Sequence, residues 1–252
     1  MRKIFGGIGR LFKSLWRYVK NNAWIQPILM VGLIFAIIFG LTKAPGAWDT
    51  IKGWFKTDTE EPQNITELGG KKSKNGESAK GTNELIAMFE DDKTFVVIFG
   101  GTDCTLCKSF NKNVLNVYLD SKNGEKYQDD IYYYYSNQFI EYLNDLYEDD
   151  SEAEAKELAE KYEEKLMLNH FIPAYEEFYG EEYTTKSTVG NIEFYSAETP
   201  AILYVVEGEV MGILFGDISG ESNPVVRFSE TLAAWKANDS EAFKAVLEEI
   251  NK

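Results

Sequence analysis

The stretch TFVVIFGGTDCTLCKSF, residues 94–110, decides the fold. Residues 94–100 form a short, continuous apolar run rich in β-branched residues, which is typical of a strand buried on both faces. Two glycines end this run. Cys104 and Cys107 then open the segment 104–119, whose apolar residues fall at helical spacing. The stretch therefore predicts a buried strand, a glycine turn and a helix that carries both cysteines near its N-terminus.

The cysteine pair suits thiol–disulfide chemistry. Residues at positions i and i+3 of a helix lie on one face, close enough for a disulfide. The free N–H groups and the dipole of the first helical turn stabilise a thiolate on Cys104, and Cys107 is held nearby to resolve a mixed disulfide. A metal site would need further ligands. Only His170 and carboxylates remain, so we expect no metal, and we expect His170 to pack in the fold.

Two further segments predict strands. IYYYYS, residues 131–136, is rich in tyrosine, and its four consecutive tyrosines should alternate between the two faces of a sheet and pack there. PAILYVVEGEVMGILFG, residues 200–216, predicts two strands joined by a turn at Glu207 and Gly208.

Helical patterns fill much of the remaining chain. We expect the folded part to start near Asn83 with a helix, and residues 137–180 to be mostly helical with a solvated acidic face. The chain closes with a helix over 240–250, for which Ser240 is the expected N-cap. Strand, helix, strand, helices, hairpin and helix describe an α/β fold with a central mixed sheet flanked by helices.

The charge of the chain is divided unevenly along its length. Residues 1–56 hold nine Lys and Arg against one acid, whereas residues 57–252 hold seventeen against forty, which gives net charges of +8 and −23. A domain this acidic repels phosphate backbones, so nucleic acid is not an expected partner.

The basic part contains a predicted membrane span. AWIQPILMVGLIFAIIFGL, residues 23–41, carries no charge, and nineteen residues of helix reach about 28 Å, close to the hydrocarbon thickness of a bilayer. Basic residues are concentrated before the span, so the positive-inside rule predicts a cytoplasmic segment over 1–22 and export of everything after Leu41. We expect segment 1–22, which is basic and amphipathic, to lie on anionic lipids, and residues 42–82 to form a juxtamembrane segment and flexible linker.

A cleaved signal peptide is the alternative, because Thr42-Lys43-Ala44 is an acceptable cleavage site. The long basic head and the long apolar run favour a retained anchor.

On these residues the chain resembles the thioredoxin superfamily. Residues 94–110 resemble its strand, CxxC motif and helix, and Thr199-Pro200, at the start of the next hydrophobic strand, resembles its cis-proline. The resemblance covers roughly residues 83–252, apart from a helical insertion at about 137–190. The order of an anchor, a linker and this motif is similar to the membrane-anchored thioredoxin-like proteins of Gram-positive bacteria, which include bacteriocin accessory factors.

The resemblance implies a thioredoxin-like fold and thiol–disulfide exchange on exported proteins at the outer face of a Gram-positive cell membrane. Cys104 would be the attacking nucleophile and Cys107 the resolving thiol, and the backbone at Thr199 and Pro200 would bind the substrate. No cofactor is implied, but a redox partner must recycle the cysteine pair.

The sequence departs from the family's pattern at several positions. Asp103 stands where the family has tryptophan, and its negative charge should oppose thiolate formation, which Lys108 partly offsets. Ile98 stands where typical thioredoxins have a buried acid that relays protons. The central Thr-Leu dipeptide lacks the histidine of strong oxidants, so a strongly oxidising pair is not expected.

These departures keep a second interpretation open. In it the chain is a non-catalytic subunit that uses the acidic insertion and the N-terminus to bind a membrane transport or secretion complex.

Overall fold

The computed structural model of the chain describes residues 60–69, 76–149, 151–216, 218–221 and 223–250. The predicted cytoplasmic segment and membrane span, residues 1–41, lie outside this range. Within the described residues, no helix has both the length and the apolar character needed to cross a bilayer.

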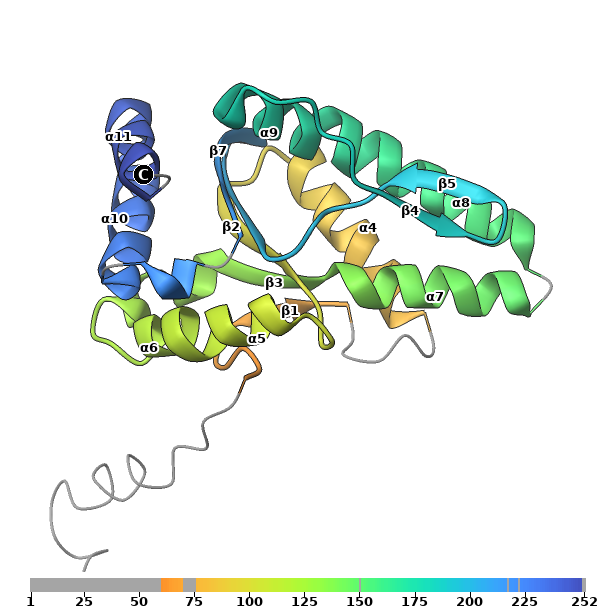
Figure 1. Cartoon of the computed structure of the whole chain (residues 1–252), viewed down its shortest axis with the longest axis horizontal. Helices are drawn as coiled ribbons and strands as arrows, with labels where there is room; N and C mark the ends of the chain where they lie inside the picture. Colours follow the sequence, from red (N-terminus) through yellow and green to blue (C-terminus); the bar gives the residue numbers. More distant parts are fainter. Residues whose placement is uncertain (1–59, 70–75, 150, 217, 222, 251–252) are drawn as a thin grey trace, which may run out of the picture. The chain divides into compact units, whose positions relative to one another are not determined.

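A five-stranded mixed sheet lies at the centre of the domain (Figure 1). Its spatial order is β1–β3–β2–β6–β7, in which β1 and β2 run parallel to β3, β6 runs antiparallel to β2, and β7 runs antiparallel to β6. This sheet, flanked by helices, is thioredoxin-like in its general topology. The strands are β1 (Thr66–Leu68), β2 (Phe95–Gly100), β3 (Ile131–Tyr135), β6 (Ala201–Val206) and β7 (Glu209–Phe215).

One face of the sheet is covered by a long helical layer and a small hairpin. Phe95, Val97 and Phe99 of β2 enter the core on this side. The covering elements are α4 (Glu77–Glu90), α7 (Ser136–Glu148), α8 (Glu152–Tyr162), the π-helical segment η4 (Glu163–Phe171), α9 (Ile172–Tyr179), β4 (Lys186–Val189) and β5 (Ile192–Tyr195). In Figure 1, α7, α8 and the β4–β5 hairpin extend together beyond the sheet.

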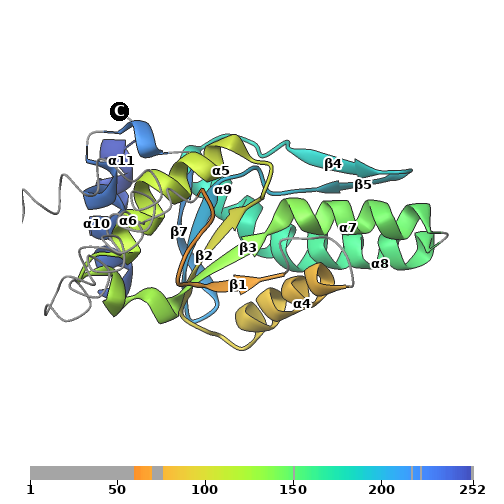
Figure 2. The same ribbon diagram turned by 90° about the horizontal axis from the view of Figure 1, so that it is seen from below.

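The opposite face is covered by the helix that follows the cysteines and by the last two helices. Val96 and Ile98 of β2 enter the core on this side. Its helical elements are α5 (Thr105–Phe110), the π-helical segment η1 (Asn111–Leu115), α6 (Asn116–Leu119), α10 (Pro224–Lys236) and α11 (Ser240–Ile250). Figure 2 shows α5 and α6 as one continuous helical rod across the sheet. Three single 3₁₀ turns complete the set, η2 (Gly124–Lys126), η3 (Gln128–Asp130) and η5 (Ile218–Gly220).

The strands predicted from the sequence are confirmed. Every residue of β2 is buried, because helices cover both faces of the sheet. The hairpin of β6 and β7 turns at Glu207 and Gly208, which have φ angles of 50° and 76°. Positive φ at both central residues is the requirement of the tight turn that matches strand twist. The tyrosines of β3 alternate as expected, with Tyr134 in one core cluster and Tyr133 in the other.

The folded domain begins further upstream than the expected boundary at Asn83. The stretch 42–82, expected to be a flexible linker, contains β1 and the first two turns of α4. Its glycines suggested flexibility, but one of them, Gly81, serves close packing: a Cβ atom at Gly81 would lie 2.0 Å from the backbone nitrogen of Gly69. The small residues therefore let α4 dock directly on the end of β1.

The closing helix begins at Ser240 as expected, but its N-terminus is capped by the preceding residue. The backbone N–H of Ala242 donates to Oδ1 of Asp239 at 2.9 Å. α10 and the β4–β5 hairpin were not predicted from the sequence. Both elements lie within the part of the chain assigned to the domain.

Candidate functional site

The cysteine pair lies where the central strand passes into a helix. β2 ends at Gly100, and α5 begins at Thr105, directly after Cys104. The backbone N–H of Cys107 donates to Sγ of Cys104 at 3.0 Å, so this sulfur caps the helix. An N-terminal turn offers free N–H donors and a positive dipole end, both of which favour negative charge on the capping atom. The local geometry therefore suits a thiolate at Cys104.

The two cysteines form a disulfide with an S–S distance of 2.08 Å and a Cα–Cα distance of 5.2 Å. Their exposures differ: Cys107 is completely buried, whereas Cys104 is partly exposed. Leu106, between them, is 52% exposed. An incoming sulfur therefore reaches Cys104 and not Cys107.

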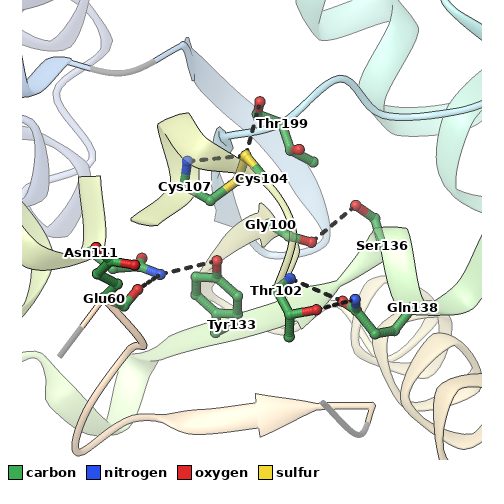
Figure 3. Close-up of a disulfide and its surroundings, with 10 residues drawn as sticks. All are labelled: Glu60, Gly100, Thr102, Cys104, Cys107, Asn111, Tyr133, Ser136, Gln138 and Thr199. Atoms are coloured by element: carbon green, nitrogen blue, oxygen red, sulfur yellow. Dashed lines mark hydrogen bonds between the residues drawn. A yellow bond between two sulfur atoms is a disulfide. The ribbon is translucent and has the colours of Figure 1, made fainter. Parts of the chain in front are cut away.

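The predicted substrate-binding residues lie beside this disulfide. Sγ of Cys104 is 3.6 Å from the carbonyl oxygen of Thr199 (Figure 3). The Thr199-Pro200 peptide bond is cis, as the resemblance implies. Pro200 is buried, and its carbonyl oxygen accepts a 2.8 Å hydrogen bond from the N–H of Gly216. The structure thus brings together all four residues that the sequence singled out.

The loop before the cysteines is held by the start of α7. Nε2 of Gln138 donates to Oγ1 of Thr102 at 2.6 Å, and the N–H of Thr102 donates to Oε1 of Gln138 at 3.4 Å. Gln138 is fully buried. Oγ of Ser136 donates to the carbonyl oxygen of Gly100 at 3.3 Å. These residues were not predicted from the sequence, because a polar side chain in a predicted helix gives no signal of a partner 36 positions away.

Residues 60–63, here called the strap, are bound to the helix that carries the disulfide. Nδ2 of Asn111 donates to the carbonyl oxygen of Glu60 at 3.2 Å. Asn116 makes two bonds, from its Nδ2 to the carbonyl oxygen of Glu61 at 2.8 Å and from the N–H of Gln63 to its Oδ1 at 3.0 Å. Side-chain amides therefore fasten the strap to successive turns of the helix.

A cavity of about 440 Å³ lies between the strap and the cysteine-bearing helix. It is lined by Glu60, Glu61, Pro62, Gly101, Thr102, Lys108, Asn111, Tyr133 and Tyr135. Tyr133 and Tyr135, expected only to pack in the core, therefore also line a cavity near the cysteines. Burial raises the pKa of Tyr133 to about 12, so its hydroxyl stays protonated near neutral pH.

Three acidic residues near the cysteine loop interact with one another. The pKa of Glu141 is raised, first by burial and then by the negative charges of Asp103 and Asp145. Asp103 is exposed, and its predicted effect on a Cys104 thiolate stays a prediction. Ile98 is fully buried and pairs with Tyr133 in the sheet.

His170 packs in the fold, as expected. Its ring stacks on Phe89 with a centroid separation of 4.0 Å, and burial lowers its pKa. Among the described residues, no group of three or more His, Cys, Asp or Glu side chains is arranged to hold a metal ion.

Comparison with protein-family models, with curated proteins and with solved structures finds no match to this chain.

Proposed function

We propose that the chain is a thiol–disulfide oxidoreductase of the thioredoxin superfamily. The observation that carries the proposal is the arrangement at Cys104: its sulfur caps a helix, forms a disulfide with buried Cys107 and lies 3.6 Å from the carbonyl oxygen of Thr199. The thioredoxin-like order of the sheet supports the same assignment.

In the oxidising direction, a substrate thiolate attacks Sγ of Cys104 and breaks the S–S bond. Cys107 leaves as a thiolate and takes up a proton, while the substrate is held in a mixed disulfide. A second substrate thiolate then attacks the substrate sulfur of that bond and releases Cys104 as a thiolate, which the helix N-terminus stabilises. The substrate dithiol is oxidised and the enzyme disulfide is reduced, and the reverse sequence reduces a substrate disulfide.

The residues around Cys104 define where a substrate chain would bind. Exposed Leu106 offers an apolar contact, and the segment at Thr199 and Pro200 offers backbone groups next to the reacting sulfur. The exchange itself passes electrons only between sulfur atoms, so it requires no cofactor. A second redox protein must return the pair to its starting state.

We further propose that the domain works outside the membrane of a Gram-positive cell on exported proteins. The support is the sequence: an uncharged span over 23–41, basic residues concentrated before it and an acidic domain after it. Segment 1–22 would contact anionic lipids at the cytoplasmic face.

The direct test is the equilibrium between the Cys104–Cys107 disulfide and glutathione, measured on the full chain in mild detergent. A reversible two-electron couple supports the proposal. A value of about −270 mV would favour a reductase and one of about −120 mV an oxidase. A pair that never closes, or never opens under strong reductant, would overturn it.

One observation favours a second candidate, a non-catalytic binding subunit of a membrane transport or secretion complex. The segment between β3 and β6 builds α7, α8, α9 and the β4–β5 hairpin, and part of it extends beyond the sheet (Figure 1). Such an extension suits a partner surface. Replacement of Cys104 by serine should abolish the phenotype of an enzyme and spare that of a binding subunit.

A further inference from the structure

An unpaired amide oxygen is buried one helical turn after Cys107. Asn111 is 2% exposed, and its Oδ1 has no hydrogen-bond partner within the described structure. Its Nδ2 donates to the carbonyl oxygen of Glu60 and to the hydroxyl of Tyr133, each at 3.2 Å (Figure 3). The carbonyl of Glu60 can only accept a hydrogen bond, so the amide nitrogen of Asn111 must face it. Oδ1 therefore lies on the other side of the amide group. A buried acceptor without a partner is costly and requires an explanation.

The helix geometry directs Asn111 toward the buried cysteine. The backbone N–H of Asn111 donates to the carbonyl oxygen of Cys107, so the two residues are one α-helical turn apart on the same face. Side chains on a helix lean toward its N-terminus, which carries the Asn111 amide toward Cys107.

The oxidation state of Cys107 decides whether its sulfur can donate a hydrogen bond. Both sulfurs are joined in the disulfide, so Sγ of Cys107 carries no hydrogen to donate. Oδ1 itself is buried, although Asn111 also lines the cavity beside the strap, and Cys107 is completely buried. When the disulfide opens, the thiol of Cys107 becomes a new donor on the helix face that carries Asn111.

We propose that the reduced thiol of Cys107 donates a hydrogen bond to Oδ1 of Asn111, so that Asn111 favours the dithiol over the disulfide. The step balances with dithiothreitol as reductant: its two thiols become a cyclic disulfide, while the Cys104–Cys107 bond accepts two electrons and two protons. One of these protons is bound by Sγ of Cys107 and gains the amide oxygen as its acceptor. The inference deepens the proposed function. It rests on that proposal only because it requires that the Cys104–Cys107 disulfide can be reduced.

Asn116 provides a matched control. Like Asn111, it lies on the helix after the cysteines and binds the strap, through Glu61 and Gln63. It lies nine positions after Cys107 in the sequence, more than two helical turns away. Its replacement therefore disturbs the strap without touching the thiol.

The first experiment measures the dithiol–disulfide equilibrium of the full chain against dithiothreitol. Asn111→Leu should shift it toward the disulfide by about threefold to tenfold, the effect of one net hydrogen bond. Asn116→Leu should leave it within about twofold of the wild type, because no bond to sulfur is lost. Asn111→Asp keeps an acceptor oxygen and should stay at the wild-type value or shift toward the dithiol. Equal shifts in Asn111→Leu and Asn116→Leu would overturn the proposal.

The second experiment records the infrared S–H stretching bands of the reduced chain. The Cys107 band is the one that disappears in Cys107→Ser. In the wild type it should lie at lower frequency than in the urea-unfolded chain, and Asn111→Leu should return it toward the unfolded value. A wild-type band already at the unfolded frequency would refute the bond, even if Asn111→Leu fails to fold. A lowered band in a chain that does not exchange with glutathione would sink the proposed function and leave this bond standing.

Discussion

Gly81 of α4 lies directly against Gly69 at the end of β1. A Cβ atom at Gly81 would lie 2.0 Å from the nitrogen and 2.5 Å from the Cα atom of Gly69. Both contacts are to backbone, which cannot rotate away as a side chain can. The docking of α4 on β1 therefore requires glycine at position 81.

Replacement of Gly81 by alanine should destabilise the domain. In an unobstructed helix the change would stabilise by up to about 1 kcal/mol, because alanine is the better helix former. Here the steric conflict should dominate and cost about 1–3 kcal/mol in the free energy of unfolding, which urea denaturation measures. Gly220 is the control, since a Cβ there meets nothing within 4 Å. A Gly81→Ala chain as stable as Gly220→Ala would contradict this account.

The sequence predicted the elements whose signals are local. The apolar run of β2, the Glu207-Gly208 turn and the tyrosines of β3 each carry their structure in adjacent residues. α10 also had a signal that was not used: Phe228, Leu232 and Trp235 are buried at helical spacing. The start of the domain was harder to predict, because glycine in close packing looks the same in sequence as glycine in a flexible linker.

The residues of the candidate site also fall into those with a local sequence signal and those without one. The cysteines are only three positions apart in the sequence, and the resemblance supplied Thr199 and Pro200. The partners of Thr102 and Asn111 depend on contacts with Gln138 and Glu60, which lie 36 and 51 positions away. An amide side chain can accept hydrogen bonds from many groups and can donate them to many others. The sequence therefore does not specify which partner each amide will bind.

Removal of the Gln138 side-chain amide should loosen the loop before the cysteines. Gln138→Leu leaves Oγ1 and the N–H of Thr102 without their buried partner, which should cost about 1–3 kcal/mol in unfolding free energy. Asn144→Ala is the control. Within the described residues, the Asn144 side chain bonds only to the carbonyl oxygen of Ile140 in its own helix, so its removal should change stability by less than about 0.5 kcal/mol. The account is wrong if both variants unfold at the same urea concentration.

Stability should fall with acidity through His170, the one histidine of the chain. Burial lowers its folded-state pKa below the ordinary value of 6.5, so the unfolded chain binds this proton first as the pH falls. The free energy of unfolding should therefore decrease from pH 6.5 downward until the folded pKa is passed. His170→Phe keeps the stacking on Phe89 and should remove this part of the decrease. Urea midpoints measured at intervals from pH 8 to about 5 test it, and parallel curves for the two chains would contradict the assignment.

The two cysteines should differ in reactivity after reduction. Cys104 is partly exposed and caps the helix, whereas Cys107 is completely buried. Iodoacetamide should therefore modify Cys104 at least about tenfold faster, because alkylation requires an accessible thiolate. Peptide mass spectrometry of briefly treated protein gives both rates. In urea the two rates should converge, and equal rates in the folded chain would show that Cys104 is not the reactive thiol.

Replacement of Cys107 by serine should convert the chain into a trap for its substrates. The Cys104 thiolate can still attack a substrate disulfide, forming a mixed disulfide and expelling the other substrate sulfur as a thiolate. Cys107 is no longer there to release the bound substrate, so covalent complexes should accumulate. They should appear as slower bands on a non-reducing gel of cell membranes and vanish when dithiothreitol is added. Cys104→Ser is the matched control and should trap nothing, because the remaining sulfur is buried. Equal trapping by the two variants would show that Cys104 is not the specific attacking cysteine. No trapping by Cys107→Ser would favour the binding subunit over the oxidoreductase.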